Sequence, residues 1–392
     1  MSLSDKPFDI VVFGASGYTG RLVAEYLAAE YAGSDLKWAM AGRSLEKLAA
    51  VRAEMGISEA VELLAVDVDD PGSVTHMVDA CRVVITTVGP YQLYGDELVK
   101  KCAERRTDYV DLTGEPSWMH ETIAQYSSAA KASGARIVHS CGFDSIPFDL
   151  GVYRLQQHAI AKMSQPIAAV KGRVRAMHGT FSGGTIASMR ATMASAKANP
   201  AIIQVLTNPF ALTEGFTGPE QPAGTAPQYD EELTSWSAPF IMAPINTKNI
   251  HRSNFLLGHQ YGEDFRYDEM LLTGDGDQGK AAADYVAKDD SVAKSDLQPG
   301  EGPTKEEREN GNYDAIFAGE TSEGELMISS VQGDRDPGYG STSKMLAEAA
   351  MCLLVNPDMA SGGLWTPAAA MGDALMARLQ EHAGLTFQIE KG

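Results

Sequence analysis

The feature that most constrains this chain is an apolar run that ends in three evenly spaced glycines, FDIVVFGASGYTG at residues 8–20. Its first half has the composition of a buried strand, and the residues after the third glycine have the apolar periodicity of a helix. Gly14, Gly17 and Gly20 therefore occupy a strand-to-helix turn at GxxGxxG spacing. Such a turn lets a pyrophosphate approach the backbone N–H groups that begin the helix.

Each glycine has a separate predicted task in this turn. Gly14 allows the tight bend, Gly17 lets the pyrophosphate approach the backbone, and Gly20 lets the helix pack closely on the sheet. An ordinary strand-to-helix turn is the alternative, but position and context favour a dinucleotide site. The residues expected to contact the dinucleotide are Gly14, Ala15, Ser16, Gly17, Tyr18, Thr19 and Gly20.

The first 140 residues alternate between segments with strand character and segments with helical character. The strand-like segments lie at residues 10–13, 36–42, 61–67, 82–90, 108–114 and 135–140. Strands this apolar, separated by helices, predict a parallel sheet that is covered on both faces. Six of them match the doubly wound dinucleotide-binding (Rossmann) fold, so we expect an α/β protein.

The residues after the second strand indicate which dinucleotide is bound. An NAD enzyme places an acid there for the ribose 2′-hydroxyl, whereas this chain has Gly42, Arg43 and Ser44. A guanidinium and a hydroxyl suit a 2′-phosphate, so NADP is the predicted cofactor. Arg43 could otherwise be a solvated surface charge. Asp67 ends the third strand, where it could reach the adenine amino group or cap the next helix.

The end of the fourth strand should lie at the ligand crevice, because the carboxyl ends of parallel strands form it. Val88, Gly89 and Pro90 are therefore expected near the nicotinamide ribose. Tyr91 follows them and could point into the active cleft.

Seven motifs, which include those already described and are spread over nearly the whole chain, form a specific set. They are GASGYTG, AGRSLEKL, TTVGPYQLYGDELVKKCAERRTDYVDLTGE, HSCGFDSIPFDLG, FSGGTIASM, MAPINTKNIHRSNFLLG and the tail that begins GYGSTSKMLAEAAMCLL. Together they resemble the saccharopine dehydrogenase-like oxidoreductases, and more narrowly the branch with the mycobacterial trans-acting enoyl reductases. The resemblance implies a nicotinamide dinucleotide and an oxidoreductase. In that branch the substrate is a carbon–carbon double bond in a lipid-linked polyketide.

Three domains are expected along the chain: an NADP-binding domain at 1–145, an inserted α+β domain at 146–335, and C-terminal helices at 336–392 that pack back on the first domain. The strand-like segments of the middle part are 169–181, 251–258, 264–272 and the hairpin 313–333. A proline-rich stretch, 215–249, is either a surface loop or a lid. The resemblance implies that the middle domain forms the substrate side of the cleft and often a dimer contact, so a homodimer is one expectation.

Hydride transfer to a double bond or an imine also requires a proton donor, and three residues are predicted to be catalytic. Tyr91, Asp144 and Arg252 belong to the motifs VGPY, CGFD and HRS, which we expect to converge in one cleft. Each has a structural alternative: Tyr91 could pack in a turn, Asp144 could cap a helix, and Arg252 could pair with an acid. His139 is a further candidate for proton donor, and it could instead hydrogen-bond the backbone.

Composition limits the partners and the compartment. The formal charge is 32 − 52 = −20, which would repel nucleic acid and anionic lipid as broad partners. No apolar run approaches the roughly 18 residues that span a bilayer, so we expect no integral membrane segment. The four cysteines are far apart and form no CxxC pair, which favours a reducing cytoplasm and argues against a metal site. Association with a membrane surface is a further expectation that stays open.

These observations favour an NADP-dependent reductase that acts on a C=C or C=N bond of a small-molecule or lipid-linked substrate. One alternative is a redox sensor that binds NADP without turnover. Another is a saccharopine-type amino-acid dehydrogenase, although few basic residues stand out as anchors for two carboxylates.

Overall fold

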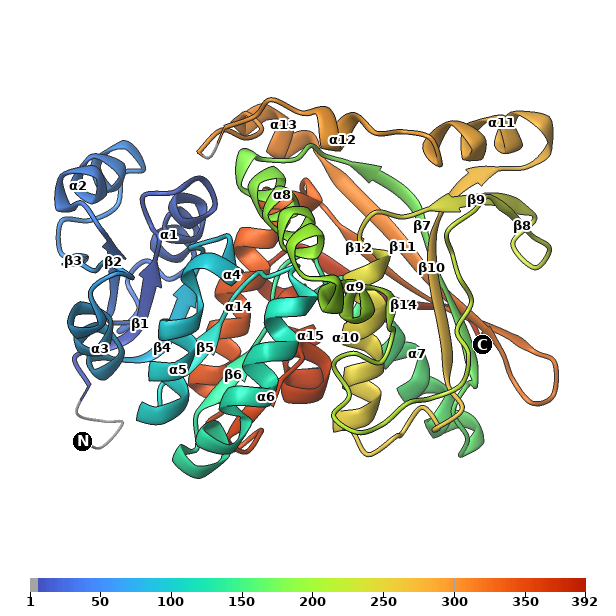
Figure 1. Ribbon diagram of the computed structural model, residues 1–392, viewed down its shortest axis with the longest axis horizontal. Helices are drawn as coiled ribbons and strands as arrows, with labels where there is room; N and C mark the ends of the chain where they lie inside the picture. The colour runs from blue at the N-terminus through green and yellow to red at the C-terminus, as the bar shows by residue number, and fades with distance from the viewer. Residues whose placement is uncertain (1–5, 299) are drawn as a thin grey trace.

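The computed structural model describes residues 6–298 and 300–392 and contains two seven-stranded sheets (Figure 1). The first sheet is parallel throughout, in the order β13-β6-β5-β4-β1-β2-β3. Its strands are β1 (Phe8–Phe13), β2 (Trp38–Gly42), β3 (Glu62–Ala65), β4 (Cys81–Thr86), β5 (Asp108–Val110), β6 (Arg136–Val138) and β13 (Gly363–Trp365). The α/β fold and the six predicted strands are confirmed, and β13 is an addition that the sequence did not indicate.

Burial on both faces explains why this sheet is parallel. Ile10, Val11 and Val12 of the central strand β1 are completely buried, and Val12 lies opposite Met40 of β2 and Ile85 of β4. Apolar side chains on both sides of a strand require helices on both faces. The helices of this part are α1 (Tyr18–Glu30), α2 (Leu45–Glu54), α3 (Pro71–Ala80), α4 (Tyr91–Tyr94), α5 (Asp96–Arg105), α6 (Pro116–Ser133) and α14 (Thr342–Val355).

The second sheet is mixed, in the order β14-β12-β11-β7-β10-β9-β8, with one parallel pair, β7 and β10. Its strands are β7 (Ala169–His178), β8 (Gln228–Asp230), β9 (Ser235–Pro239), β10 (Arg266–Gly274), β11 (Asn312–Glu320), β12 (Leu326–Gly333) and β14 (Leu385–Lys391). The predicted hairpin at 313–333 is present as β11 and β12. Helices α7 and α10 pack against this sheet.

The remaining helices lie around and beyond the second sheet. They are α7 (Ile146–Met163), α8 (Gly183–Ala198), α9 (Pro200–Thr207), α10 (Ala243–Leu256), α11 (Gly276–Val286), α12 (Ser291–Lys294), α13 (Lys305–Asn310), the short π-helical turn η2 (Pro337–Ser341) and α15 (Pro367–His382). The prediction of a strand at 251–258 is wrong, because residues 251–256 form the end of α10. None of the described helices combines the length and the apolarity needed to cross a membrane.

The end of the chain returns to both sheets. Helix α14 packs against α1 and β4 of the first part, whereas α15 packs against α14 and α7. Strand β14 then pairs with β12, so the expectation of helices alone after residue 336 is corrected. The proline-rich stretch 215–249 contains β8, β9 and the start of α10. The domain limits at 145 and 335, and the role of this stretch as a lid, stay predictions.

Candidate functional site

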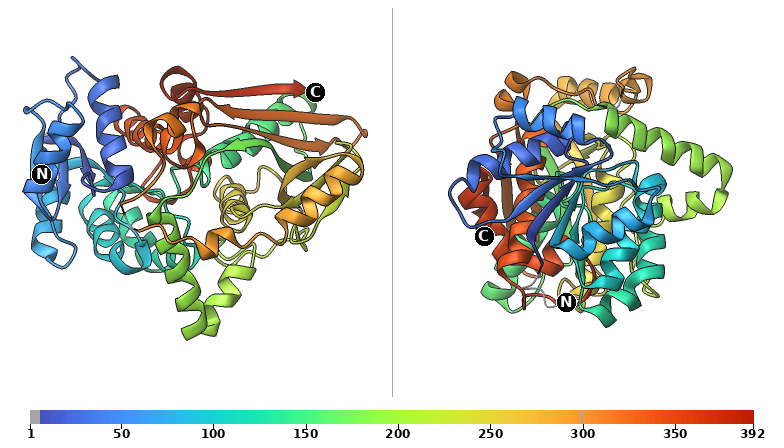
Figure 2. Two further views of the ribbon diagram at one scale, coloured as in Figure 1. Left: turned by 90° about the horizontal axis from the view of Figure 1, so that it is seen from above. Right: turned by 90° about the vertical axis from the view of Figure 1, so that its left-hand side faces the viewer.

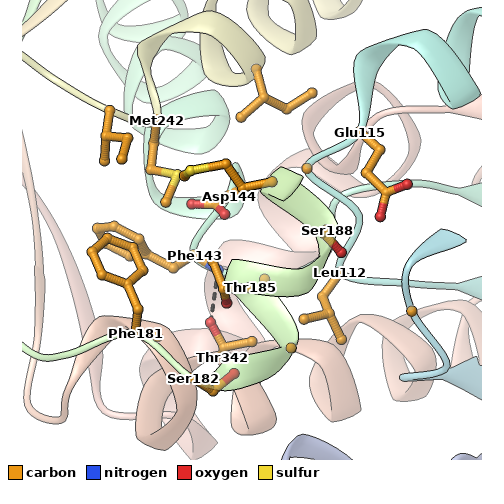
Figure 3. Close-up of a pocket in the computed structure, with 18 of the residues that line it drawn as sticks. Leu112, Glu115, Phe143, Asp144, Phe181, Ser182, Thr185, Ser188, Met242 and Thr342 are labelled. Carbon is orange, nitrogen blue, oxygen red and sulfur yellow. Dashed lines mark hydrogen bonds between the residues drawn. The ribbon is translucent and has the colours of Figure 1, made fainter. Parts of the chain in front are cut away.

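A cavity of about 440 Å³ lies between the two sheets. One wall consists of the residues that follow β4, β5 and β6, at the carboxyl edge of the first sheet. The opposite wall consists of the segment after β7, helix α8 and the start of α10, and η2 closes one side (Figure 3). This is the edge at which open parallel sheets bind their ligands.

The glycine turn has the geometry that a dinucleotide site requires. Gly14 has φ +89°, a conformation that glycine adopts without strain. A Cβ atom at Gly20 would lie 2.2 Å from the carbonyl oxygen of Gly14. Only glycine therefore allows helix α1 to begin this close to the end of β1.

The start of α1 has free donors for an anion. Gly17 is its N-cap, no side chain caps it, and its first turn contains no acid. The backbone N–H groups of Tyr18, Thr19 and Gly20 donate no hydrogen bond to the described residues. Unsatisfied donors at a helix N-terminus bind phosphate groups. The turn therefore fits a dinucleotide pyrophosphate, and Thr19 also lines the cavity.

The residues predicted to hold the adenosine lie beside this turn. Arg43 is exposed just beyond β2, and its guanidinium has no ion pair among the described residues. Ser44 caps α2, because its hydroxyl accepts a hydrogen bond from the Lys47 N–H at 3.2 Å; its own O–H can still donate. Asp67 accepts from the N–H of Asp69 at 3.1 Å and does not cap the next helix, because Asp70 is the N-cap of α3.

Tyr18 contributes to this region through its backbone alone. Its hydroxyl donates to the carbonyl of Pro303 and lies 3.0 Å from a guanidinium nitrogen of Arg308. Its ring meets that of Tyr339 edge to face at 5.1 Å. The side chain thus joins the dinucleotide turn to the second half of the chain.

The segment after β4 reaches the cavity as predicted. Gly89 lies on the cavity wall, and a Cβ atom there would lie 3.7 Å from the Ser188 hydroxyl of α8. Val88 and Pro90 flank it but are not on the wall. Val88 also approaches the glycine turn, since a Cβ atom at Gly14 would lie 2.9 Å from its Cγ2, so this segment connects the turn to the cavity.

The Tyr91 ring lines the cavity, but its hydroxyl forms hydrogen bonds with backbone groups. The hydroxyl donates to the carbonyl of Thr86 at 3.0 Å and accepts from the N–H of Leu112 at 3.4 Å. The ring stacks on Trp118, and burial raises the pKa of Tyr91 well above its ordinary value. This corrects the prediction of Tyr91 as a catalytic residue: the group is a packing element, which was the alternative.

Asp144, the second of the predicted catalytic residues, also lies in the cavity. It follows β6, and its side chain lies in the cavity near Met242 (Figure 3). Its Oδ1 atom is buried and accepts no hydrogen bond from the described residues. Desolvation raises the pKa of this carboxyl group to about 7. The group can therefore hold a proton at neutral pH and present it to a bound molecule.

The second acid on the cavity wall, Glu115, already accepts hydrogen bonds at both carboxylate oxygens. Glu115 accepts hydrogen bonds from the N–H of Tyr91 at 2.9 Å and of Gln92 at 2.8 Å, one at each carboxylate oxygen. Among the described residues that line the cavity, none is lysine, arginine or histidine. Of the two described acids that line the cavity, Asp144 is thus the one with a carboxylate oxygen that has no hydrogen-bond partner.

Arg252 does not belong to the site. It is 2 % exposed, does not line the cavity, and donates to the carbonyls of Leu212 and Leu364. The predicted catalytic role of Arg252 is therefore wrong: the arginine ties the start of β13 to the segment after α9. His139 is also buried, with its Nδ1 2.7 Å from Asp111.

Sequence reasoning missed the contribution of α8 and η2. The Tyr339 hydroxyl accepts from the Ser182 N–H and lies 2.9 Å from the Thr185 hydroxyl. Thr342 accepts from the N–H of Phe143 at 2.9 Å, which fixes the residue before Asp144 (Figure 3). The motifs FSGGT and GYGST contained the signal, but serines beside glycines are typical of ordinary turns.

Comparisons with known proteins place the chain among described families. The saccharopine dehydrogenase NADP binding domain family matches residues 10–138. A Mycobacterium tuberculosis protein named as a candidate trans-acting enoyl reductase is 39% identical, over 99% of both chains. The trans-acting enoyl reductases of Mycobacterium bovis and Mycobacterium ulcerans are 34% and 33% identical, over 97% of each chain.

A solved structure supports the fold. Apo saccharopine dehydrogenase (L-Glu forming) from Saccharomyces cerevisiae aligns over 97% of this chain and 99% of its own, with a TM-score of 0.55 and 12% identity. The family match at residues 10–138 indicates NADP as the cofactor. Given relatives of this identity over nearly its full length, the protein belongs to the trans-acting enoyl reductase branch of the saccharopine dehydrogenase-like oxidoreductases.

Proposed function

We propose that this oxidoreductase reduces an activated carbon–carbon double bond in an apolar acyl substrate, with NADPH as reductant and Asp144 as proton donor. The observation that carries the proposal is the buried, unpartnered oxygen of Asp144 in a mostly apolar cavity at the carboxyl edge of the first sheet. The names of the relatives support the same reaction class.

Reduction of the double bond requires a hydride and a proton, and the residues of the chain must deliver the proton. The bound dinucleotide would supply the hydride to the β-carbon of the double bond. Asp144 gives its proton to the α-carbon as the new C–H bond forms, and its carboxylate then takes a proton from solvent. A carboxyl group with a pKa of about 7 is suited to this exchange near neutral pH.

The cavity walls favour an apolar substrate over an amino acid. Met189, Met193, Leu206, Phe240 and Met242 offer aliphatic, thioether and aromatic surface to a hydrocarbon chain. A saccharopine-type substrate carries several carboxylates, and a site without a cation would leave them unpaired. This supports enoyl reduction over the amino-acid dehydrogenase alternative and over reduction of a charged imine.

The test compares Asp144→Asn with wild type on α,β-unsaturated acyl thioesters of increasing chain length, followed by NADPH consumption. We expect kcat to fall about a hundredfold or more, with the Kd for NADPH unchanged. Asp149→Asn is the matched control: Asp149 is also buried, and burial raises its pKa to about 7, but it accepts from Ser253 and Ala368 outside the cavity.

The pH dependence supplies a second readout. Because the donor must be protonated, wild-type activity should fall as the pH rises through about 7. Asp144→Asn should lose this descending limb, whereas Asp149→Asn should keep it. Full turnover by Asp144→Asn, or an unchanged pH profile in that variant, would remove Asp144 from the reaction.

A further inference from the structure

Helices α8 and α9 form a hairpin that projects from the body of the molecule (Figure 2). One side of the hairpin faces inward, since Met189 and Met193 of α8 and Leu206 of α9 line the cavity. The opposite side has little cover: helix α9 has no buried residue, although its sequence, PAIIQVLT, is mostly apolar.

The composition of this region differs from that of the rest of the chain. Between Asp149 and Glu214 there is no acidic residue, although the chain contains 52. The hairpin itself carries two charges, both positive, Arg190 and Lys197. The acidic surface of the protein would repel anionic lipid, whereas the positively charged hairpin would not.

Exposed apolar side chains concentrate around this hairpin. Of eight large hydrophobic residues that are exposed in the described part of the chain, five lie on the hairpin or in segments beside it. These are Leu93, Tyr94, Met193, Ile203 and Ile241. Gln92, next to Leu93, hydrogen-bonds Thr192 and Ser195 of α8, and Ile241 shares the cavity wall with Met193.

The hairpin is fastened at its base. The buried Lys248 ammonium donates to the carbonyl of Leu206 at 2.7 Å, and the imidazole of His120 lies 2.7 Å from the carbonyl oxygen of Ala211. Arg252 donates to the carbonyl of Leu212. The projecting end is thus held in place by contacts that leave its outer apolar side chains free.

We propose that the α8–α9 hairpin docks on the interfacial region of a lipid bilayer that contains anionic headgroups. Helices are suited to this region because their backbone groups are already hydrogen-bonded, while apolar side chains enter the acyl boundary and cations meet the headgroups. A narrow, projecting pair of helices fits such a deformable surface better than the flat, self-complementary face that a second copy would need.

Docking here would place the cavity beside the lipid phase. Met193 is 61 % exposed and also lines the cavity, so it belongs to both surfaces. An acyl chain could pass from the bilayer along the hairpin into the cavity with its apolar surface covered. The docking itself does not depend on which reaction the cavity supports.

The test is co-flotation of the full chain with vesicles of phosphatidylcholine and phosphatidylglycerol, compared with phosphatidylcholine alone. Ile203→Glu should lower the vesicle partition coefficient about tenfold or more. Lys197→Glu should weaken binding to the mixed vesicles more than to the neutral ones. Val355→Glu is the matched control, because Val355 is 52 % exposed against 48 % for Ile203 but lies at the end of α14.

Equal binding of Ile203→Glu and Val355→Glu, or no binding of wild type to either vesicle, would overturn the proposal. Sedimentation without lipid tests the other occupant: a dimer that Ile203→Glu dissociates would assign the hairpin to a second copy of the chain. Asp144→Asn should bind vesicles like wild type, so failure of the proposed reaction and failure of docking are distinguishable.

Discussion

Replacing Arg252 with methionine should destabilise the fold without changing the chemistry in the cavity. The guanidinium is buried and donates to two carbonyls, those of Leu212 and Leu364. Each hydrogen bond from a charged group contributes about 1.5–3 kcal/mol, and a carbonyl left unpaired in the interior is costly. The variant also removes a buried charge, whose desolvation lowers the pKa of Arg252 to about 10. The net loss in unfolding free energy should be about 2–4 kcal/mol.

Urea unfolding of wild type and Arg252→Met measures this loss directly. Arg252→Lys is the control, since a single ammonium keeps the charge but cannot span both carbonyls, so its loss should be smaller. The KM for an enoyl thioester, measured at a temperature where each variant is folded, should stay unchanged. A large rise in KM with unaltered unfolding free energy would refute the structural assignment and return Arg252 to the site.

Two further substitutions test residues near the cofactor. Arg43→Ala should weaken NADPH binding about tenfold to a hundredfold, because charge-assisted hydrogen bonds to the 2′-phosphate are lost. The affinity for NADH should hardly change. Calorimetric titration of both cofactors checks this, and equal losses of affinity would contradict it. Tyr91→Phe should lower the free energy of unfolding by about 1 kcal/mol, since the hydroxyl that donates to the Thr86 carbonyl is removed. The pH profile of turnover should stay unaltered. Loss of its descending limb would show that Tyr91 is a proton donor.

The first sheet was predictable because its signals are local. Apolar runs that alternate with helical segments end at glycines and helix caps, as at Gly14 and Ser44, and these features need no distant partner. Strand β13 could not be found in this way. It has three residues, Gly363–Trp365, and its pairing with β6 depends on a contact some 230 positions away along the chain, since Leu364 lies opposite Ile137.

Helix α10 was missed because its buried face is polar. Asn246, Lys248, Asn249 and Arg252 are all buried in it, so the apolar periodicity of an amphipathic helix is absent. The same fact explains the error over Arg252: a lone basic residue in a motif looks functional until its partners, two backbone carbonyls, are seen. Asp144 was found because it follows a strand of the parallel sheet, where topology alone brings side chains to the crevice.

The two late strands have a consequence for how the chain reaches its native state. Strand β13 forms one edge of the first sheet and β14 forms one edge of the second. Neither sheet can be completed until residues beyond 363 have left the ribosome, so contacts of very long sequence separation must close last. Neither sheet is therefore formed by one continuous segment of the chain. A premature stop before Gly363 should therefore expose open sheet edges in both halves together, which makes aggregation during synthesis the expected fate of such a fragment.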